Sequence, residues 1–517
     1  MNLLVSLAIY LVVFNWKTSS ELRPEQDLDL QKTVVWGPGL KSEFFLPVRY
    51  FFIQAVSSDG ENITESLGDK PFEVSLSSPT QNRMRVYLQI LDKQDGMYIV
   101  RFRIHSTLEN IKIAVTYNGE HVAKSPYEMP GFMYPETCYC PEPDIQQWFT
   151  SMECTNLYKQ IKNDLSLFKD VDLEKTAAET IQRFNTTTAL GVCYYKIIDN
   201  KIYRKTYGQR VGFKMFSDAI LLSLTKKVKL PDLEFFVNVY DWPLEKRKQT
   251  ENPLPIISWC GSDDSLDIVM PTFDLTEATL EMLGRQSRDI FHVMGKSPTR
   301  WESKTEIGFW RGRDSRQERL DLVMMSRKHP DLLDAKMTRM SYFKHDQEKY
   351  GDLVNIIPFF DFFKYKYLVN IDGTVAAYRL PYLLAGDSVV LKQDSHYYEH
   401  FYKDLKPYVH YVPFKRDLSD LLEKIQWAKD NDEKVHEIAR NAQNYVLQNL
   451  SPKEIFCYHV KLFESYSKRF KSPPTPPDDT WELVEQPKDS NNCNCQKMKQ
   501  KYSDKSKTKS NRRKDDL

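Results

Sequence analysis

The chain has 517 residues, too many for one hydrophobic core, and this length predicts two to four domains. Its composition is that of a folded protein, with 41% hydrophobic and 28% charged residues and a formal net charge of +1 at pH 7. Such a near balance of positive and negative charges gives no reason to expect nucleic acid as a partner, because nucleic-acid-binding domains concentrate basic charge.

Residues 1–20 have the features of a secretory signal peptide. An apolar run extends from Leu3 to Phe14, and small polar residues follow it; this order is typical of a segment that directs secretion. A membrane anchor is the alternative, but the run is too short to cross a bilayer, and no other segment reaches spanning length. We therefore predict a lumenal chain without a transmembrane segment.

Residues 28–135 alternate apolar and polar side chains in short runs separated by turn signals, which indicates a β-sandwich. The runs cover residues 51–56, 85–91, 96–104 and 111–117. The segment resembles a filamin-type immunoglobulin-like repeat. The resemblance is carried by Trp36-Gly-Pro-Gly-Leu40, by Asp95-Gly-Met-Tyr-Ile-Val-Arg-Phe and by Tyr117-Asn-Gly-Glu-His-Val-Ala-Lys-Ser-Pro126. Such repeats bind peptides or space other domains, and this one holds no catalytic constellation.

From about residue 140 to residue 465, short buried strands alternate with amphipathic helices, which is an α/β pattern. Strands are predicted at residues 233–239 and 267–270, and helices at residues 212–226, 417–430 and 433–448. A region of this length fits two doubly wound domains better than one. We place them at residues 138–304 and 305–468.

Asp241 stands at the end of a predicted buried strand, in Phe235-Phe-Val-Asn-Val-Tyr-Asp241-Trp-Pro243. The carboxyl ends of strands in such sheets open on the ligand crevice. An ionised carboxylate there accepts a proton from a hydroxyl group within hydrogen-bond reach. The alternative is an aspartate that only caps a turn before Trp-Pro.

Four arginines lie between positions 311 and 319, in Trp310-Arg-Gly-Arg-Asp-Ser-Arg-Gln-Glu-Arg319, after a predicted strand at residues 307–310. Arginines after a strand–glycine turn suit a polyanionic ligand. The alternative is a solvated helix start whose arginines pair with Asp314 and Glu318.

A strand–helix–strand unit follows between residues 367 and 392, with a Gly373-Thr374 turn and a helix that carries Arg379. The N–H groups at a helix N-terminus suit phosphate oxygens, and an arginine one turn inside the helix would clamp a diphosphate. His396 and Glu399, just after the second strand, are possible partners of sugar hydroxyls. The chain contains neither a Walker-type phosphate loop nor the kinase signatures, which argues against a nucleoside triphosphate phosphotransferase.

The end of the chain, residues 471–517, reads as a proline-rich linker and a basic tail. It closes with Lys514, Asp515, Asp516 and Leu517, one acidic exchange away from the retrieval tetrapeptide of the endoplasmic reticulum. Together with the signal peptide, this ending predicts a protein of the lumen of that organelle and the KDEL receptor as a partner.

Eight cysteines fit an oxidising compartment, and we expect disulfides rather than zinc, because no metal-ligand spacing recurs. Cys138, Cys140 and Cys154 form a cluster, whereas the others are dispersed or lie in the tail. Three glycosylation sequons, at Asn62, Asn185 and Asn449, agree with a lumenal chain.

The α/β region resembles the CAP10-like glycosyltransferases. Besides the segments around Asp241, Arg319 and Arg379, the resemblance is carried by Ser326-Arg-Lys-His-Pro330, Lys364-Tyr-Lys-Tyr-Leu and His410-Tyr-Val-Pro413. A filamin-type repeat in front and a retrieval signal behind are typical of the KDEL-motif-containing protein O-glucosyltransferases within this family.

The resemblance implies a GT-B fold, with an acceptor-side and a donor-side Rossmann-like domain. It also implies a metal-independent, inverting transfer of glucose from UDP-glucose to a serine of EGF-like repeats, such as those of Notch and fibrillin types, without a cofactor. By motif, Asp241 becomes the general base. The residues implied to bind the UDP-sugar are Gly312, Arg313, Arg319, Thr374, Val375, Ala376, Ala377, Tyr378 and Arg379, with a looser match at Arg210. The same resemblance pairs Cys138 with Cys457 and Cys140 with Cys154.

Two alternatives stay open at this stage. One is xylosyl transfer from UDP-xylose, because nothing in the sequence distinguishes the missing hydroxymethyl group. The other is a lumenal protein with an inactive site that uses its β domain to bind clients.

Overall fold

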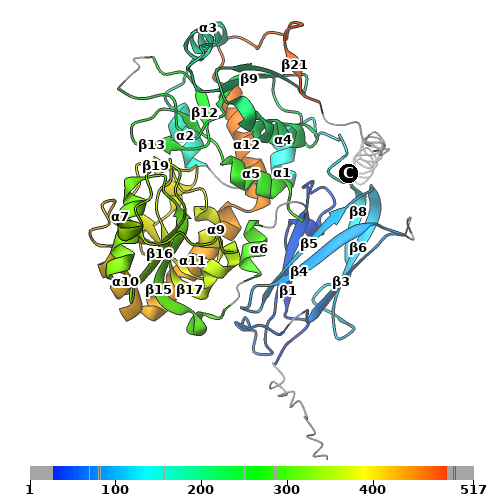
Figure 1. Ribbon diagram of the computed structural model, residues 1–517. Helices are drawn as coiled ribbons and strands as arrows, with labels where there is room; N and C mark the ends of the chain where they lie inside the picture. The colour runs from blue at the N-terminus through cyan, green and yellow to red at the C-terminus, as the bar shows by residue number, and fades with distance from the viewer. Residues whose placement is uncertain are drawn as a thin grey trace, which may run out of the picture.

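A computed structural model describes residues 27–68, 70–79, 81, 83–154, 158–248, 252–283, 288–296, 299–485, 493 and 495. These residues form a β-sandwich and two α/β units (Figure 1). The predicted signal peptide at residues 1–20 and the retrieval tetrapeptide at residues 514–517 lie outside the described residues. Within the described residues, no helix is long and apolar enough to cross a membrane.

The predicted β-sandwich is confirmed. One sheet has the strand order β1-β2-β5-β4, and the other joins β3, β6 and β7, with β8 paired to β6. Its core includes Phe51, Tyr98, Val100 and Ile113, which are fully buried between the sheets. The strands are β1 (Val34–Trp36), β2 (Arg49–Gln54), β3 (Phe72–Ser77), β4 (Val86–Asp92), β5 (Met97–Ile104), β6 (Leu108–Tyr117), β7 (Glu120–His121) and β8 (Tyr127–Met133).

The first α/β unit contains a mixed sheet of order β14-β12-β11-β9-β10-β21. The prediction of a doubly wound sheet is correct only for its parallel part, β11, β12 and β14. Strands β9 and β10 pair antiparallel because Asp199 and Asn200 form a two-residue turn with φ of 46° and 63°. The strands are β9 (Val192–Ile198), β10 (Lys201–Tyr207), β11 (Leu233–Asn238), β12 (Ile256–Ser258), β14 (Ile268–Val269) and β21 (Glu482–Leu483).

Among the described residues, six α-helices belong to the same stretch of the chain. They are α1 (Ile145–Ser151), α2 (Lys159–Leu165), α3 (Leu173–Phe184), α4 (Lys214–Thr225), α5 (Phe273–Leu280) and α6 (Ile290–Met294). The helix predicted at residues 212–226 is therefore confirmed as α4.

The second α/β unit has a fully parallel sheet of order β16-β15-β17-β18-β20. Its strands are β15 (Thr305–Arg313), β16 (Leu333–Arg339), β17 (Tyr365–Asn370), β18 (Val389–Gln393) and β20 (Val412–Phe414), and its helices are α7 (Gln317–Lys328), α8 (Gln347–Tyr350), α9 (Leu380–Ala385), α10 (Leu421–Asp430), α11 (Asp432–Asn449) and α12 (Pro452–Ser467). The chain order of the strands reverses between β15 and β17, and ligands of doubly wound sheets bind at such a point.

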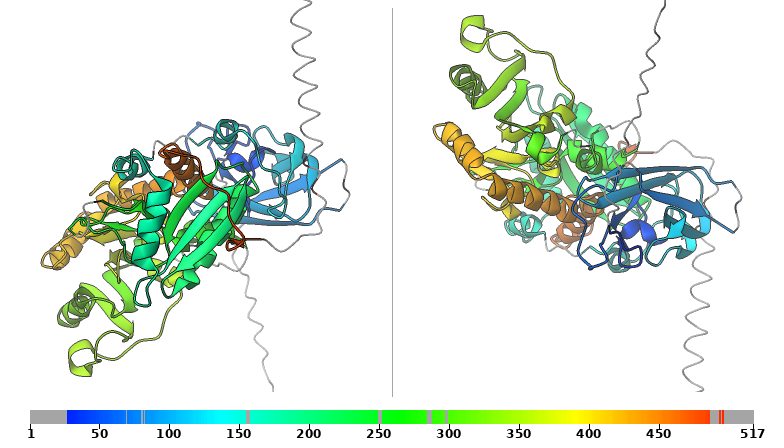
Figure 2. Two further views of the ribbon diagram at one scale, coloured as in Figure 1. Left: turned by 90° about the horizontal axis from the view of Figure 1, so that it is seen from above. Right: turned by 90° about the horizontal axis from the view of Figure 1, so that it is seen from below.

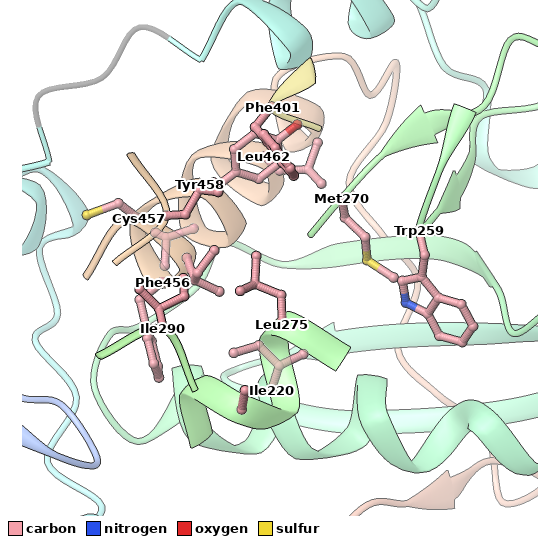
Figure 3. Close-up of a cluster of buried hydrophobic side chains, with 14 of the residues drawn as sticks. Ile220, Trp259, Met270, Leu275, Ile290, Phe401, Phe456, Cys457, Tyr458 and Leu462 are labelled. Atoms are coloured by element: carbon pink, nitrogen blue, oxygen red, sulfur yellow. The ribbon is translucent and has the colours of Figure 1, made fainter. Parts of the chain in front are cut away.

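The last helix returns to the first α/β unit. The Tyr458 hydroxyl donates a hydrogen bond to the carbonyl of Val269, at 2.7 Å. Tyr458 and Leu462 of α12 lie with Met270 and Leu275 in one buried cluster (Figure 3). The two α/β units are also joined by a short antiparallel ribbon of β13 (Gly261–Ser262) and β19 (Tyr397–Tyr398). Figure 2 shows that the sandwich and most of the second unit lie on opposite sides of the molecule.

The segment predicted as a linker is packed rather than free at its start. Strand β21 pairs with β10, and the Trp481 ring contacts Tyr194 edge-on and the ammonium groups of Lys196 and Lys205. The proline-rich composition predicts a linker and gives no sign of this packing. Trp481 anchors the segment to the edge of the sheet.

The predicted disulfide pairings are wrong. Cys138 bonds to Cys493, Cys140 bonds to Cys495, and Cys154 bonds to Cys457. The Cα atoms of each pair lie 5.4–5.7 Å apart, within the range that a disulfide spans. A disulfide does tie the first α/β unit to the last helix, but through Cys154, because the tail returns to occupy Cys138 and Cys140. Cys193 and Cys260 are buried thiols.

The three sequons differ in their surroundings. Asn62 and Asn185 are exposed, whereas Asn449 is half-buried in the last turn of α11. There its side-chain amide donates a hydrogen bond to the carbonyl of Tyr445, at 2.8 Å.

Candidate active site

The ends of three strands supply most of the predicted site residues. Asp241 follows β11 of the first unit, Arg313 is the last residue of β15, and residues 371–379 follow β17. Because β15 and β17 flank the point where the strand order reverses, the arginines and the loop after β17 share one edge of the parallel sheet.

The loop that carries Asp241 is held by buried polar side chains. The Asn238 amide donates hydrogen bonds to the carbonyl of Trp242 and to the Ser258 hydroxyl, at 2.7 and 3.1 Å. The Asp267 carboxylate accepts hydrogen bonds from the Ser258 hydroxyl, at 2.6 Å, and from the backbone N–H groups of Leu244 and Glu245, at 2.8 and 2.9 Å. Both ends of the Asp241 turn are therefore fixed by the neighbouring strands.

The Asp241 side chain is half-buried and faces the second unit. Burial raises the pKa of its carboxyl group, and the guanidinium of Arg313 opposes that rise. Asp241 in turn contributes to raising the pKa of Tyr378, behind burial and Cys260. The Cys260 thiol donates to the Asp241 carbonyl at 3.3 Å. The carboxyl group is thus within electrostatic reach of Arg313 and Tyr378 of the second unit.

Arg319 joins the ends of two strands. Its guanidinium donates hydrogen bonds to the carbonyls of Asp372, Arg313 and Ile371, at 2.7, 2.9 and 3.3 Å. Only 5% of the residue is exposed, and burial and the nearby Arg379 lower its pKa to about 9. Three backbone carbonyls therefore hold this arginine, whose predicted role was to bind the donor.

Arg379 does not lie inside a helix as predicted. Helix α9 begins at Leu380, Arg379 is its N-cap, and residues 374–378 form a loop. The N–H group of Gly373 donates a hydrogen bond to the carbonyl of Val375, which turns the chain sharply. Residues 374–378 therefore do not continue as a helix. The Arg379 guanidinium donates to the carbonyl of Arg311 at 2.8 Å, and burial and Arg288 lower its pKa to about 10.

The loop residues between Gly373 and Arg379 are mostly buried. Val375, Ala376 and Ala377 are 2–7% exposed, and the Tyr378 ring meets Phe273 of α5 edge-on at 5.6 Å. Tyr378 is thus a contact between the two α/β units beside Asp241, and Thr374 is half-buried at the start of the loop.

Gly312 precedes an irregularity in the strand. The register of β15 against β16 shifts between Gly312 and Arg313, and such bulges redirect side chains next to active sites. A Cβ at position 312 would lie 2.5 Å from the buried Trp310 ring, so glycine is required there. The shift leaves Arg313 exposed at the strand end.

The other arginines of this segment form ion pairs, and one of these is a pair of the alternative interpretation: Arg316 lies 3.9 Å from Glu318. Arg311 pairs with Asp334 at 2.7 Å, and Arg316 lies 3.6 Å from Asp372. Asp314, which that interpretation paired with an arginine, instead accepts backbone N–H groups from the loop after β16.

Three further candidates lie outside this group of arginines. Arg210 is exposed and donates to the Tyr240 hydroxyl at 2.8 Å, next to the Asp241 turn. His396 pairs with Asp263 at 3.1 Å. Glu399 is fully buried, and burial raises its pKa to about 8.

Sequence reasoning missed the residues that hold the site. Asn238 and Asp267 lie in predicted buried strands, and the apolar pattern gives them no role. A buried amide or carboxylate in an apolar run nevertheless needs a hydrogen-bond partner. That need was the available signal. Within the part of the chain that the structure describes, no three or more histidine, cysteine, aspartate or glutamate side chains are grouped so that they could hold a metal ion.

The parallel sheet of the second α/β unit thus carries basic residues at its switch point, and the candidate carboxylate Asp241 belongs to the first unit. In agreement, the family Glycosyl transferase family 90 matches residues 149–516, and Filamin/ABP280 repeat matches residues 27–128. The chain belongs to glycosyl transferase family 90 and carries an N-terminal filamin repeat.

The similar proteins agree with this assignment. The chain is 54% identical to Protein O-glucosyltransferase 2 of Danio rerio over 89% of this chain and 91% of that protein. It is 47% identical to Protein O-glucosyltransferase 3 of Homo sapiens over 92% and 94%. With Protein O-glucosyltransferase 1 of Homo sapiens it shares 30% identity over 62% and 81%.

Proposed function

We propose that this chain is a protein O-glucosyltransferase of the lumen of the endoplasmic reticulum. It transfers glucose from UDP-glucose to a serine hydroxyl of EGF-like repeats in secreted and cell-surface proteins, such as those of Notch and fibrillin types. The names of the similar proteins support the reaction. The observation that carries the proposal is the setting of Asp241: its carbonyl accepts a hydrogen bond from the Cys260 thiol, and its carboxyl group interacts electrostatically with Arg313 and Tyr378 of the opposite unit.

The reaction follows from these groups. Asp241 accepts the proton of the serine hydroxyl while the serine oxygen forms a bond to the anomeric carbon. The bond from that carbon to the diphosphate oxygen breaks, and UDP leaves with the bonding electrons. Attack from the face opposite the diphosphate inverts the anomeric carbon. The pKa of Asp241, raised by burial, makes its carboxylate a better proton acceptor than an exposed aspartate.

The arginines supply the positive charge for the leaving group. Arg313 is exposed at the end of β15, and Arg319 and Arg379 keep N–H donors beyond those bound to carbonyls. Fixed cationic donors at the place where charge develops lower the barrier without a metal ion. In this proposal the fold is GT-B: the first unit binds the acceptor and the second binds the donor.

A transfer assay tests the proposal. The substrate is a purified, folded EGF-like repeat, and mass spectrometry follows the gain of one hexose from UDP-glucose or one pentose from UDP-xylose. Asp241→Asn keeps the shape of the side chain and removes the base, so we expect turnover to fall by about 10²–10⁴-fold. Asp199→Asn, at a side chain 79% exposed on the β9–β10 turn, is the matched control.

Each outcome is informative. Pentose transfer in place of hexose would assign the xylosyl reaction. The absence of any transfer by the wild-type chain, with UDP binding retained, would favour the client-binding alternative. Near-full turnover by Asp241→Asn would remove Asp241 as the base.

A further inference from the structure

The loop at residues 341–343 presents two aromatic side chains to solvent on a fixed backbone. Tyr342 is 58% exposed and Phe343 is 38% exposed. The backbone N–H groups of Ser341, Tyr342 and Phe343 donate to the Asp314 carboxylate at 2.7, 2.8 and 2.8 Å, and Asp314 is completely buried. A buried carboxylate bound by three amides holds its partners firmly, because losing one bond leaves charge unsatisfied in a place without water.

The loop lies beside the candidate base. It follows β16, which pairs with β15 up to Arg313. The Arg313 guanidinium lies over the Tyr342 ring, 5.8 Å from its centroid, and the same guanidinium acts electrostatically on Asp241. Arg313 thus contacts the Tyr342 ring and also interacts electrostatically with the Asp241 carboxyl group.

A second exposed aromatic residue stands next to Asp241 on the first α/β unit. Trp242 is 39% exposed and stacks on Tyr240, with ring centroids 5.5 Å apart. Its backbone carbonyl is bound by the Asn238 amide. The two units thus each hold an exposed aromatic side chain on a hydrogen-bonded turn: Trp242 is next to Asp241 in the chain, and Tyr342 contacts Arg313.

We propose that Tyr342 and Phe343 form the donor-unit wall of the acceptor site, opposite Trp242, and contact the polypeptide around the acceptor serine. The inference rests on the proposed function, because a serine that reaches Asp241 brings its neighbouring residues within a side chain's length of Arg313. Aromatic anchors on a fixed backbone bind with little loss of conformational entropy, and they dominate the energy of most protein interfaces.

The charges nearby define the chemistry of the partner. Arg339 and Lys344, which flank the aromatic pair, are both exposed. A partner that places an acidic side chain next to an apolar one would match this surface. The fitting occupant is therefore a folded polypeptide with an apolar side chain and a carboxylate close to its acceptor serine.

The test separates acceptor binding from donor binding. For Tyr342→Ala we expect the KM for a folded EGF-like repeat to rise at least about tenfold, while the Kd for UDP, measured by calorimetry, stays within about twofold of wild type. Tyr342→Phe keeps the ring and should restore a nearly wild-type KM. Tyr87→Ala, at a tyrosine 55% exposed in the sandwich, is the matched control.

An unchanged acceptor KM in Tyr342→Ala would overturn the inference. Weakened UDP binding with an unchanged acceptor KM would overturn it as well and would place the ring against the nucleotide. The wild-type assay keeps the two proposals apart: hexose transfer by the wild type supports the proposed function whatever the variant does, and its absence removes both.

Discussion

A buried ion pair connects the filamin repeat to the α/β region, and breaking it should weaken this interface. Arg101 of β5 and Asp289, which precedes α6, are each 1% exposed, and one guanidinium nitrogen donates to both carboxylate oxygens at 2.8 Å. Asp289 also caps α6 through the His292 N–H group, and Arg101 also donates to the Gln89 side chain. Both carboxylate oxygens and two of the three guanidinium nitrogens are therefore hydrogen-bonded.

The magnitude follows from this burial. Removing one partner leaves the other charge buried and alone, which costs about 3–5 kcal/mol, whereas replacing both by uncharged groups is nearly neutral. Arg101→Met and Asp289→Ser are the appropriate substitutions, because serine also caps a helix and preserves that contribution of about 1 kcal/mol. We expect each single variant to lose about 3–5 kcal/mol of interface stability and the double variant to lose less than either.

Hydrogen exchange of the α6 amides is the suitable assay, because a chain of several domains does not unfold in one step. It reports the free energy of local opening at the interface itself. Phe291 of α6 packs between Tyr50 and Phe52 of the sandwich, so α6 opens when the repeat detaches. Single variants that lose under about 1 kcal/mol, or a double variant that loses the sum of the two, would refute the reasoning.

Three other predictions concern the site and the covalent frame. In Asp267→Asn, a side chain with its own N–H donors replaces a carboxylate that accepts two backbone N–H groups. We expect kcat to fall at least about tenfold with unchanged UDP binding, and the free energy of unfolding to fall by about 1–3 kcal/mol. An unchanged kcat in a folded variant would contradict the role of Asp267 in positioning the Asp241 turn. The raised pKa of Asp241 predicts that kcat/KM for the acceptor rises with pH through a value above the ordinary aspartate range, and a profile flat down to that range would contradict it. Cys154→Ser should lower the free energy of unfolding by about 2–4 kcal/mol. Peptide mapping of the wild-type chain without reduction should recover Cys154 joined to Cys457. Recovery of Cys138 joined to Cys457 would contradict this pairing.

Local periodicity was sufficient for the elements that carry the site. The alternation in residues 28–135 predicted the sandwich, and the apolar runs before Asp241 and Gly373 predicted β11 and β17. The helix predicted through Arg379 failed, because the Gly373 turn and the bond of Arg379 to the Arg311 carbonyl hold an irregular loop there. This bond joins residues 68 positions apart, and the residues next to Arg379 in the sequence do not predict it.

The sequence by itself determined the β-sandwich, the strands before Asp241 and Gly373, helix α4 and the family, because periodicity and motifs are properties of consecutive residues. Only the tertiary structure decided which cysteines pair, that the tail returns to the first sheet, and that Arg101 meets Asp289. These contacts join residues far apart along the chain. Their energy depends on burial and geometry, which exist only once the α/β units and the sandwich have packed together.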